Sequence, residues 1–185
     1  MSLFDADPFS FEEQPPLQEP PEDLQTSSSR TAPAPDDRAR REVFTDGACK
    51  GNPGPGGWGW VIPGEVWSSG AEDPSTNQRM EVQAVLHAIQ VLEGPHEIVS
   101  DRTYVVNCFK DGWWRGWERR GWKNSQKKAV ANQDLWKPLV QLYKERDLTF
   151  RWVKGHAGNT WNDKADELAV AAAEGNGADG EIREL

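Results

Sequence analysis

The 185-residue sequence has little cysteine, no long apolar run and no excess of positive charge. Its two cysteines, Cys49 and Cys108, are too few for a disulfide scaffold or a zinc module built from several cysteines, so we expect a reduced, cytoplasmic setting. No run of 18 apolar residues occurs, and the sequence therefore predicts no membrane span and no membrane partner. The first residues lack a basic stretch followed by an apolar one, so we expect no signal peptide.

Tryptophan is missing from residues 1–37, although the chain has ten. The same segment contains seven of the 13 prolines, and nine acidic side chains against the single basic Arg30 leave it with a charge of −8 out of −9 for the chain. A segment this polar cannot bury enough apolar surface to offset the entropy lost on ordering. We therefore predict a disordered, acidic, proline-rich tail over residues 1–40.

The tail has three candidate roles. The simplest is to keep the protein soluble. Alternatively, its negative charge competes with nucleic acid for a basic surface elsewhere on the chain, an effect that salt would weaken. The third role is a short motif for a protein partner around residues 5–9, where Leu3, Phe4, Phe9 and Phe11 supply apolar side chains. Deleting residues 1–37 tests the second role, which requires a change in nucleic-acid affinity and in its salt dependence.

Residues 41–173 are predicted to form one α/β domain, and the Gly-rich, acidic residues 174–185 a flexible C-terminal tail. Strands come first as a meander and then alternate with helices, which favours a mixed sheet over a doubly wound one. The segment GNPGPGG at 51–57 is predicted to be a loop. The predicted strands cover 41–48, 58–62, 65–71, 97–100 and 148–154, and the predicted helices cover 77–93, 103–110, 133–146 and 162–173.

Four carboxylates occupy positions that are suited to chemistry. Asp46 follows an apolar strand and precedes the Gly-rich loop, and Glu81 lies one turn into the first helix. Asp101 ends a strand, and Asp166 lies early in the last helix. A single acidic residue at any of these places more often caps a helix or faces solvent, so the surrounding sequence has to decide.

Five ordered blocks between residues 44 and 169 resemble ribonuclease H type 1, the bacterial ribonuclease HI family. They are FTDGACKGNPGPGGWG (44–59), TNQRMEVQA (76–84), SDRTYV (100–105), DGWWRGWERRGWKNSQKKAVANQDLW (111–136) and WVKGHAGNTWNDKADELA (152–169). The resemblance implies a ribonuclease-H-like α/β fold, with a five-stranded mixed sheet flanked by helices. It also implies an endonuclease that cuts the RNA strand of RNA/DNA hybrids and leaves 3′-OH and 5′-phosphate ends.

The resemblance further implies that Asp46, Glu81, Asp101 and Asp166 bind metal and act in catalysis. Phosphodiester hydrolysis needs an activated water, neutralised charge on the phosphate and a stabilised leaving oxygen, and two cations about 4 Å apart can supply all three. The expected cofactor is Mg²⁺, two ions per site with substrate, with Mn²⁺ as the alternative. A lone histidine is more often structural, but the resemblance makes His156 of the GHAG block a catalytic helper that orients water or carries protons.

Residues 102–128, the basic segment, hold eight basic and two acidic side chains with four tryptophans between them. This pattern predicts a surface for a polyanion, although at least two of the tryptophans are expected to belong to the core. The segment resembles the basic protrusion with which ribonuclease HI holds the DNA strand of a hybrid. The residues that we expect to contact substrate are Asn52, Thr76, Asn77, Trp113, Trp117, Arg119, Arg120, Trp122, Lys123 and Asn132.

One departure from the family pattern lies within the expected metal site. Arg102 follows Asp101 at a position where the family usually has serine, and it could pair with substrate phosphate or weaken metal binding. The main alternative function is a binding module that holds hybrids or double-stranded RNA without cutting, although such a module has no chemical need for the four carboxylates. We expect the protein to act as a monomer on an RNA/DNA hybrid.

Overall fold

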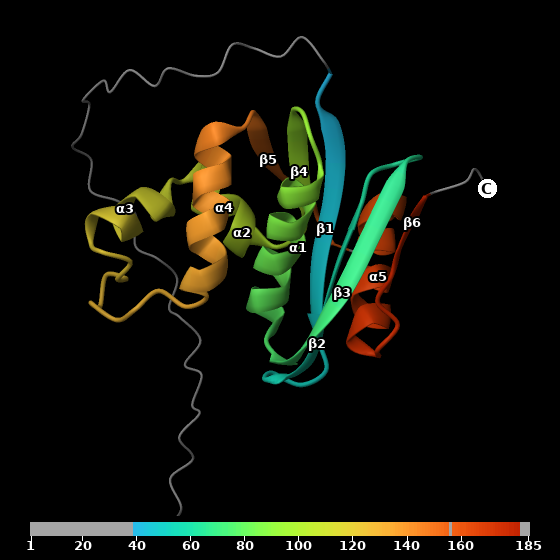
Figure 1. Ribbon diagram of the computed structural model, residues 1–185, viewed down its shortest axis with the longest axis horizontal. Helices are drawn as coiled ribbons and strands as arrows, with labels where there is room; N and C mark the ends of the chain where they lie inside the picture. The colour runs from blue at the N-terminus through green and yellow to red at the C-terminus, as the bar shows by residue number, and fades with distance from the viewer. Residues whose placement is uncertain (1–38, 156, 182–185) are drawn as a thin grey trace, which may run out of the picture. The chain divides into compact units, whose positions relative to one another are not determined.

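The computed structural model describes residues 39–155 and 157–181 (Figure 1). Apart from residues 39 and 40, the predicted acidic tail lies outside the described residues, and so does His156. The strands are β1 (Arg41–Cys49), β2 (Gly54–Val61), β3 (Val66–Ser75), β4 (His96–Ser100), β5 (Leu148–Trp152) and β6 (Asp179–Glu181). The helices are α1 (Asn77–Val91), α2 (Thr103–Lys110), α3 (Trp113–Arg119), α4 (Gln133–Glu145) and α5 (Thr160–Ala173). In this part of the chain, no helix combines the length and the apolar character that crossing a membrane requires.

The strands form one mixed sheet in the order β5-β4-β1-β2-β3-β6. β1, β2 and β3 are an antiparallel meander, whereas β4 runs parallel to both β1 and β5. The five predicted strands and the mixed sheet are therefore confirmed. The meander supplies the central strand β1 at once, and the later helical connections add two parallel strands on its other side.

β6 is an addition to that prediction. Residues 179–181 of the segment predicted to be a flexible tail pair with Val66–Ser68 at the edge of β3. Just before β6, the amide of Ser69 donates a hydrogen bond to the carbonyl oxygen of Ala178 at 2.7 Å. The outer strand of a meander leaves a row of unpaired backbone groups, and a short glycine-containing segment can lie flat against them. This pairing corrects the prediction for residues 179–181, while residues 182–185 lie outside the described residues.

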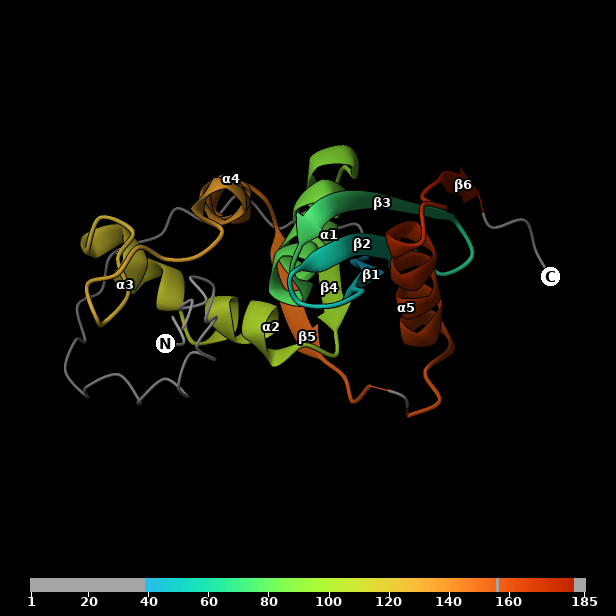
Figure 2. The same ribbon diagram turned by 90° about the horizontal axis from the view of Figure 1, so that it is seen from below.

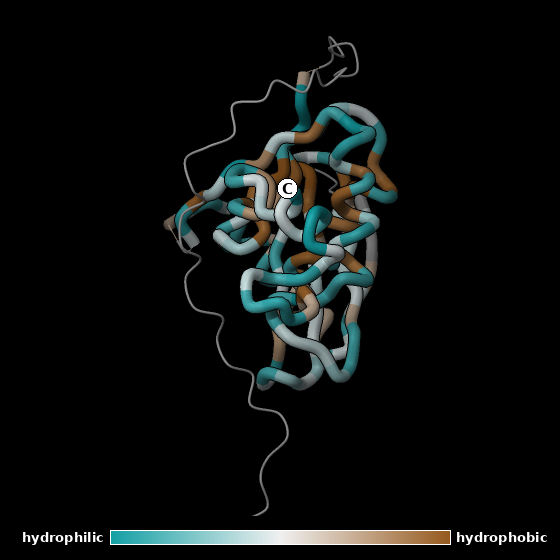
Figure 3. Tube along the Cα trace, turned by 90° about the vertical axis from the view of Figure 1, so that its left-hand side faces the viewer, coloured by the Kyte–Doolittle hydropathy of each residue, from teal (hydrophilic) through white to brown (hydrophobic). Residues whose placement is uncertain are grey.

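The core lies on both faces of the sheet because neighbouring strand residues point to opposite sides. On β1, Val43 faces the cluster formed with α1, α2 and α4, whereas Phe44 faces α5. Ile98 and Val99 of β4 divide in the same way. Figure 2 shows α5 separated from α1 and α4 by the sheet, and Figure 3 shows hydrophobic stretches gathered in the interior of the domain.

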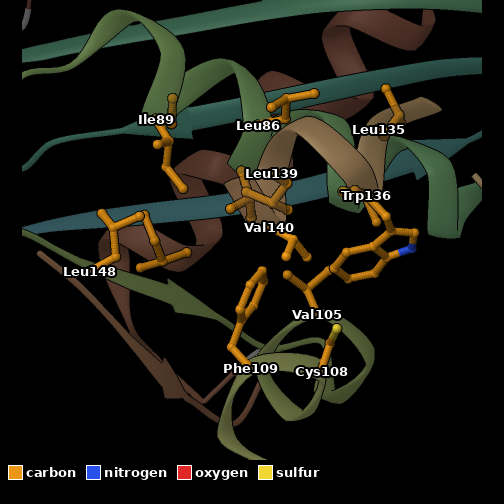
Figure 4. Packing of buried hydrophobic residues seen from close by; sticks show 14 of the residues in the cluster. Leu86, Ile89, Val105, Cys108, Phe109, Leu135, Trp136, Leu139, Val140 and Leu148 are labelled. Carbon is orange, nitrogen blue, oxygen red and sulfur yellow. The ribbon is translucent and has the colours of Figure 1, made fainter. Parts of the chain in front are cut away.

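The larger cluster is built on a fully buried tryptophan, Trp136 of α4. Its indole is contacted edge-on by Tyr104 and by Trp117, with ring centroids 5.5 and 5.3 Å apart. Figure 4 shows labelled side chains of α1, α2 and α4 pointing into one cluster, with the Trp136 ring on one side of it. The packing fixes α1 and α2 against the strands from which the candidate site is built.

The predicted loop over residues 51–57 is shorter than expected, because β2 begins at Gly54. The reason is the close approach of α5. A Cβ atom added to Gly57 would lie 2.1 Å from the carbonyl oxygen of Ala169, so only glycine lets the helix backbone rest directly on this strand. The glycines that suggested a loop therefore serve, at Gly57, as a helix-packing surface within a strand.

Candidate active site

Three elements bring the first three predicted carboxylates together. β4 runs parallel to β1 with Val99 beside Phe44, so Asp46 of β1 and Asp101, just after β4, emerge side by side at the carboxyl ends of adjacent strands. Glu81 comes from the first turns of α1, which packs on β1. The arrangement follows from the register of β1 and β4 and from the short distance between α1 and β1, the height of the helix above the strand.

Gly47 sets that height. A Cβ atom at this position would lie 2.3 Å from the backbone nitrogen of Glu81 and 2.5 Å from the carbonyl carbon of Met80. Any side chain would therefore push α1 away from β1. The glycine that follows Asp46 in the sequence allows Glu81 to lie beside it.

The three carboxylates face one cation. The Nε atom of Arg102 lies 3.3 Å from Asp101 Oδ1, 3.5 Å from Glu81 Oε1 and 3.8 Å from Asp46 Oδ1. Asp46 and Glu81 are buried, whereas the Arg102 side chain is 47% exposed. Acids from remote stretches of the chain thus converge on a single positive charge, and Arg102 belongs to this cluster rather than to the exposed basic surface.

Asp166 approaches the same cluster from the other face of the sheet. Gly59, the cross-strand partner of Asp46, packs against the carbonyl of Ala165 in α5, which places Asp166 at the same edge. The charge of Asp166 acts on both neighbours, since it raises the pKa of Asp46 and the pKa of Arg102. We call Asp46, Glu81, Asp101 and Asp166 the carboxylate cluster.

Burial and the charges of neighbouring acids make Asp46 and Glu81 reluctant to ionise. Burial, reinforced by the charge of Asp101, raises the pKa of Asp46 to about 7, although the Gly47 amide donates to Asp46 Oδ1 at 2.7 Å and opposes the shift, as does Arg102. Burial likewise raises the pKa of Glu81 to about 8, against the opposing charge of Arg102. Buried acids of like charge need a cation in order to ionise together near neutral pH.

Two contacts around Asp101 were not predicted from the sequence. The side-chain amide of Asn162, which is 2% exposed, donates to Asp101 Oδ2 at 3.3 Å, and the indole of Trp152 donates to the Asp101 carbonyl at 2.9 Å. Both residues lie in the 152–169 block that carries the family resemblance, which was the available signal. The remaining oxygen, Asp101 Oδ1, is buried without a hydrogen-bond partner.

The carboxylate cluster fits a hard divalent cation in its chemistry. Among the described residues, no three His, Cys, Asp or Glu side chains are arranged so that they hold a metal ion by themselves. Mg²⁺ does not require such a cage, because it keeps several waters and usually binds one or two carboxylates together with substrate phosphate. An all-oxygen donor set and a buried Asp101 oxygen that accepts no hydrogen bond meet those needs.

Comparison with known proteins decides the family. The RNase H family model matches residues 38–174. A ribonuclease H of Syntrophomonas wolfei is 48% identical over 133 residues, covering 69% of this chain and 91% of that protein, and one of Moorella thermoacetica is 49% identical over 135 residues, covering 70% and 89%. The crystal structure of LC9-RNase H1, described as a type 1 RNase H with the type 2 active-site motif, superposes with a TM-score of 0.65 at 28% identity, covering 80% of this chain and 77% of that one.

The chain belongs to the ribonuclease H family. Homologues of this name match it over about 70% of the chain, so the protein is a ribonuclease H enzyme. Because the family match runs from residue 38 to residue 174, it spans the region that contains the whole carboxylate cluster.

The part of the basic segment of this ribonuclease H that follows α2 lies on α3 and on the loop after it. Figure 1 shows this part of the chain on the side of α4 away from the sheet. Arg119, Arg120 and Lys123, all predicted to contact substrate, are exposed there. No helix was predicted over residues 113–119, because Trp and Arg side chains around an internal glycine give no clear helical pattern.

The four tryptophans of the segment divide between core and surface. Trp114 and Trp117 are buried, which confirms that at least two belong to the core. Trp117 is 6% exposed and packs on Trp136. This burial corrects the prediction that Trp117 contacts substrate, because its ring already forms part of the hydrophobic core. Trp113 and Trp122 are half-buried.

Trp122 adopts a left-handed backbone conformation, with φ of 62°, which is rare for a bulky residue. Its amide donates to the Trp117 carbonyl at 2.6 Å, and its own carbonyl accepts from the amide of Val130 at 3.0 Å and from the Gln133 side chain at 3.1 Å. The ammonium of Lys137 lies 5.6 Å from the centre of the ring. A partly exposed indole next to a cation is thus held in place by the surrounding backbone.

The remaining predicted contacts lie at element ends. Asn52 is exposed in the loop between β1 and β2, and Asn132 precedes α4 with φ of 57°. Thr76 caps α1, its hydroxyl accepting from the Arg79 amide at 3.2 Å. Asn77 begins the same helix one turn before Glu81, so the two side chains share a helix face.

Proposed function

We propose that this protein is an endonuclease that hydrolyses the RNA strand of RNA/DNA hybrids with two Mg²⁺ ions held by Asp46, Glu81, Asp101 and Asp166. The observation that carries the proposal is the convergence of three of these acids on one cation, Arg102, at 3.3–3.8 Å. A site that already gathers carboxylates around a positive charge is suited to divalent ions. The family membership supports the substrate class and the reaction.

The bound ions would supply an activated water and neutralise charge on the scissile phosphate. The side chains have defined tasks around them. The Gly47 amide holds Asp46 in one orientation, and Asn162 does the same for Asp101. In the reaction, water attacks phosphorus and the bond to the 3′ oxygen breaks, which leaves 3′-OH and 5′-phosphate ends. His156, which lies outside the described residues, stays a prediction as a proton carrier.

Substrate binding is proposed to extend from the carboxylate cluster to the basic segment. Exposed Arg119, Arg120 and Lys123 provide charge for the DNA backbone, and the rings of Trp113 and Trp122 provide partly exposed surfaces for its sugars. The remaining four contacts of this proposal are Asn52, Thr76, Asn77 and Asn132. Recognition through backbone and shape implies little dependence on base sequence.

The test uses labelled RNA/DNA hybrid, double-stranded RNA and duplex DNA, each incubated with the full chain in Mg²⁺, Mn²⁺ or EDTA. We expect cleavage of the RNA strand of the hybrid alone, abolished by EDTA and by Asp46→Asn. Asp147→Asn removes a surface carboxylate paired with Arg40 and serves as the matched control. Binding of the hybrid without cleavage in either metal would favour the binding module instead. Light scattering on the same samples checks the expected monomer.

A further inference from the structure

Arg102 is held at the mouth of the carboxylate cluster by its place in the chain. It lies between Asp101 and α2, and its amide donates to the Ser100 hydroxyl at 3.1 Å, which fixes the backbone there. The side chain then reaches back over the cluster, where its Nε atom faces Asp101, Glu81 and Asp46. A serine at this position would be too short and uncharged to do so.

The contacts of this guanidinium are electrostatic rather than closely hydrogen-bonded. Its nearest partner, Asp101 Oδ1, is 3.3 Å away and still lacks a hydrogen bond. Nearly half of the side chain is exposed. A long, half-exposed side chain without tight hydrogen bonds can turn toward solvent at modest cost. Arg102 therefore neutralises the acids as a bound cation would, and its side chain can still leave them.

We propose that Arg102 is an internal counter-cation that fills the carboxylate cluster in the metal-free protein and turns toward solvent when Mg²⁺ binds. This inference rests on the metal site proposed above. It has two linked consequences. Arg102 stabilises the metal-free fold because it offsets repulsion among buried acids, and it weakens Mg²⁺ binding because the same attraction has to be given up.

The expected effect of Arg102 on Mg²⁺ binding follows from the exposure of its ion pairs with the three acids. Each half-exposed ion pair is weak by itself, but one cation here faces several acids at once. We expect its removal to tighten Mg²⁺ binding by about tenfold. Salt screens such interactions, so the difference in Mg²⁺ affinity between the wild type and the variant without this cation should become smaller at high ionic strength.

The experiment compares the full chain with Arg102→Ser, which removes the cation, and Arg102→Lys, which keeps a charge of different shape. The matched control is Arg40→Ser, which removes an equal charge from a surface ion pair with Asp147. Arg40 precedes Asp46 by six residues and therefore lies about 20 Å from it along an extended strand. Mg²⁺ is titrated by calorimetry at pH 8.5 and low salt, and the melting temperature is measured in EDTA and in Mg²⁺. Neither measurement depends on cleavage.

We expect Arg102→Ser to melt earlier in EDTA, to bind Mg²⁺ about tenfold more tightly and to gain more stability from it. Arg102→Lys should lie between this variant and the wild type, and Arg40→Ser should bind Mg²⁺ as the wild type does. Equal Mg²⁺ affinities for wild type and Arg102→Ser would overturn the inference and leave the metal site standing.

Two further outcomes would also count against the inference. Unchanged Mg²⁺ affinity with weaker hybrid binding in EDTA would assign Arg102 to a substrate phosphate and overturn its role as a counter-cation. In the second outcome, neither the wild type nor Arg102→Ser shows Mg²⁺ binding that Asp46→Asn abolishes. That result would overturn the proposed metal site, and the inference with it.

Discussion

The carboxylate cluster and the basic segment are both rich in charge, but the fold constrains them differently. Asp46, Glu81 and Asp101 come from two adjacent strands and the helix packed on them, so the core dictates where they meet. Beyond α2, the basic segment lies on the short helix α3 and a loop, where Trp117 is part of the core and Arg119 is exposed. The proposed metal ligands thus come from elements that pack in the core, whereas the proposed substrate contacts lie on a short helix and a loop, where the local backbone decides which side chains are exposed.

The largest expected effect separates function from stability within the carboxylate cluster. Asp46→Asn should lower cleavage of the hybrid by about a thousandfold or more, since metal assistance is worth several kcal/mol. The same change should raise the melting temperature in EDTA, because it removes one buried charge among like charges. Cleavage rates and thermal melts check both signs. A variant that is both inactive and less stable would point to a structural role for Asp46.

Trp117 tests the other region. Trp117→Ala should cost about 3–5 kcal/mol in free energy of unfolding, because a large ring is removed from the core. Trp117→Phe retains much of the packing and should leave hybrid affinity close to the wild-type value. Urea unfolding and binding titrations provide the measurements. Loss of hybrid affinity at normal stability in Trp117→Phe would place the ring on the substrate after all.

Gly47→Ala should displace α1 and therefore carry Glu81 away from Asp46. We expect about 2–3 kcal/mol lower stability from overpacking, together with a large loss of cleavage. Gly64→Ala is the matched control, because its Cβ meets no atom within 4 Å and only its positive φ of 71° is unfavourable. That variant should lose about 1 kcal/mol and remain active. Equal activity of the two variants would contradict the role given to Gly47.

The raised carboxyl pKa values predict that the stability of the metal-free protein falls as pH rises, the opposite of the effect of carboxyl groups whose pKa is lowered on folding. Asp46 and Glu81 have pKa values of about 7 and 8 when folded, against ordinary values of 3.8 and 4.5. Between about pH 5 and pH 8 the folded chain holds more protons, so stability should fall as pH rises, by up to about 1.4 kcal/mol per unit for each group. Mg²⁺ affinity should rise over the same range. Melts in EDTA across pH test this, and Asp46→Asn with Glu81→Gln should flatten the curve.

The smallest expected effect concerns the exposed cations. Arg119→Ser and Lys123→Ser should each weaken hybrid binding a few-fold and reduce the slope of log affinity against log salt by about one. Fluorescence anisotropy in EDTA at several salt concentrations measures this slope, with Arg40→Ser as control. An unchanged slope in both variants would remove the basic segment from the substrate surface.

The sequence predicted the elements well where a pattern and a boundary signal coincide. The helix expected from Asn77 begins there because Thr76 caps it, and α4 begins at Gln133 as expected. β6 was missed because its residues carry no strand pattern. The start of β2 was predicted too late because a run of glycines resembles a loop, and only the packing of α5 shows why glycine is needed in this strand. These features depend on a neighbour that is remote in the sequence.

The candidate site was predictable to a similar degree. The four acids could be named from the blocks in which they occur, but the reach of Arg102 over the cluster and the hold of Asn162 on Asp101 required tertiary structure. Local pattern also could not separate Trp117 from Trp122, since both are Trp in a basic stretch. The contact between Trp117 and Trp136 of α4, which local sequence does not reveal, places the Trp117 ring in the core.

Anomalous scattering from crystals of the full chain grown with Mn²⁺ tests the central claim most directly, because it locates the ion rather than its effect. We predict a manganese peak beside Asp46 and Asp101, with the Arg102 side chain turned away from the carboxylate cluster. A cluster free of manganese at concentrations that support cleavage, or manganese bound only at other carboxylates, would contradict it.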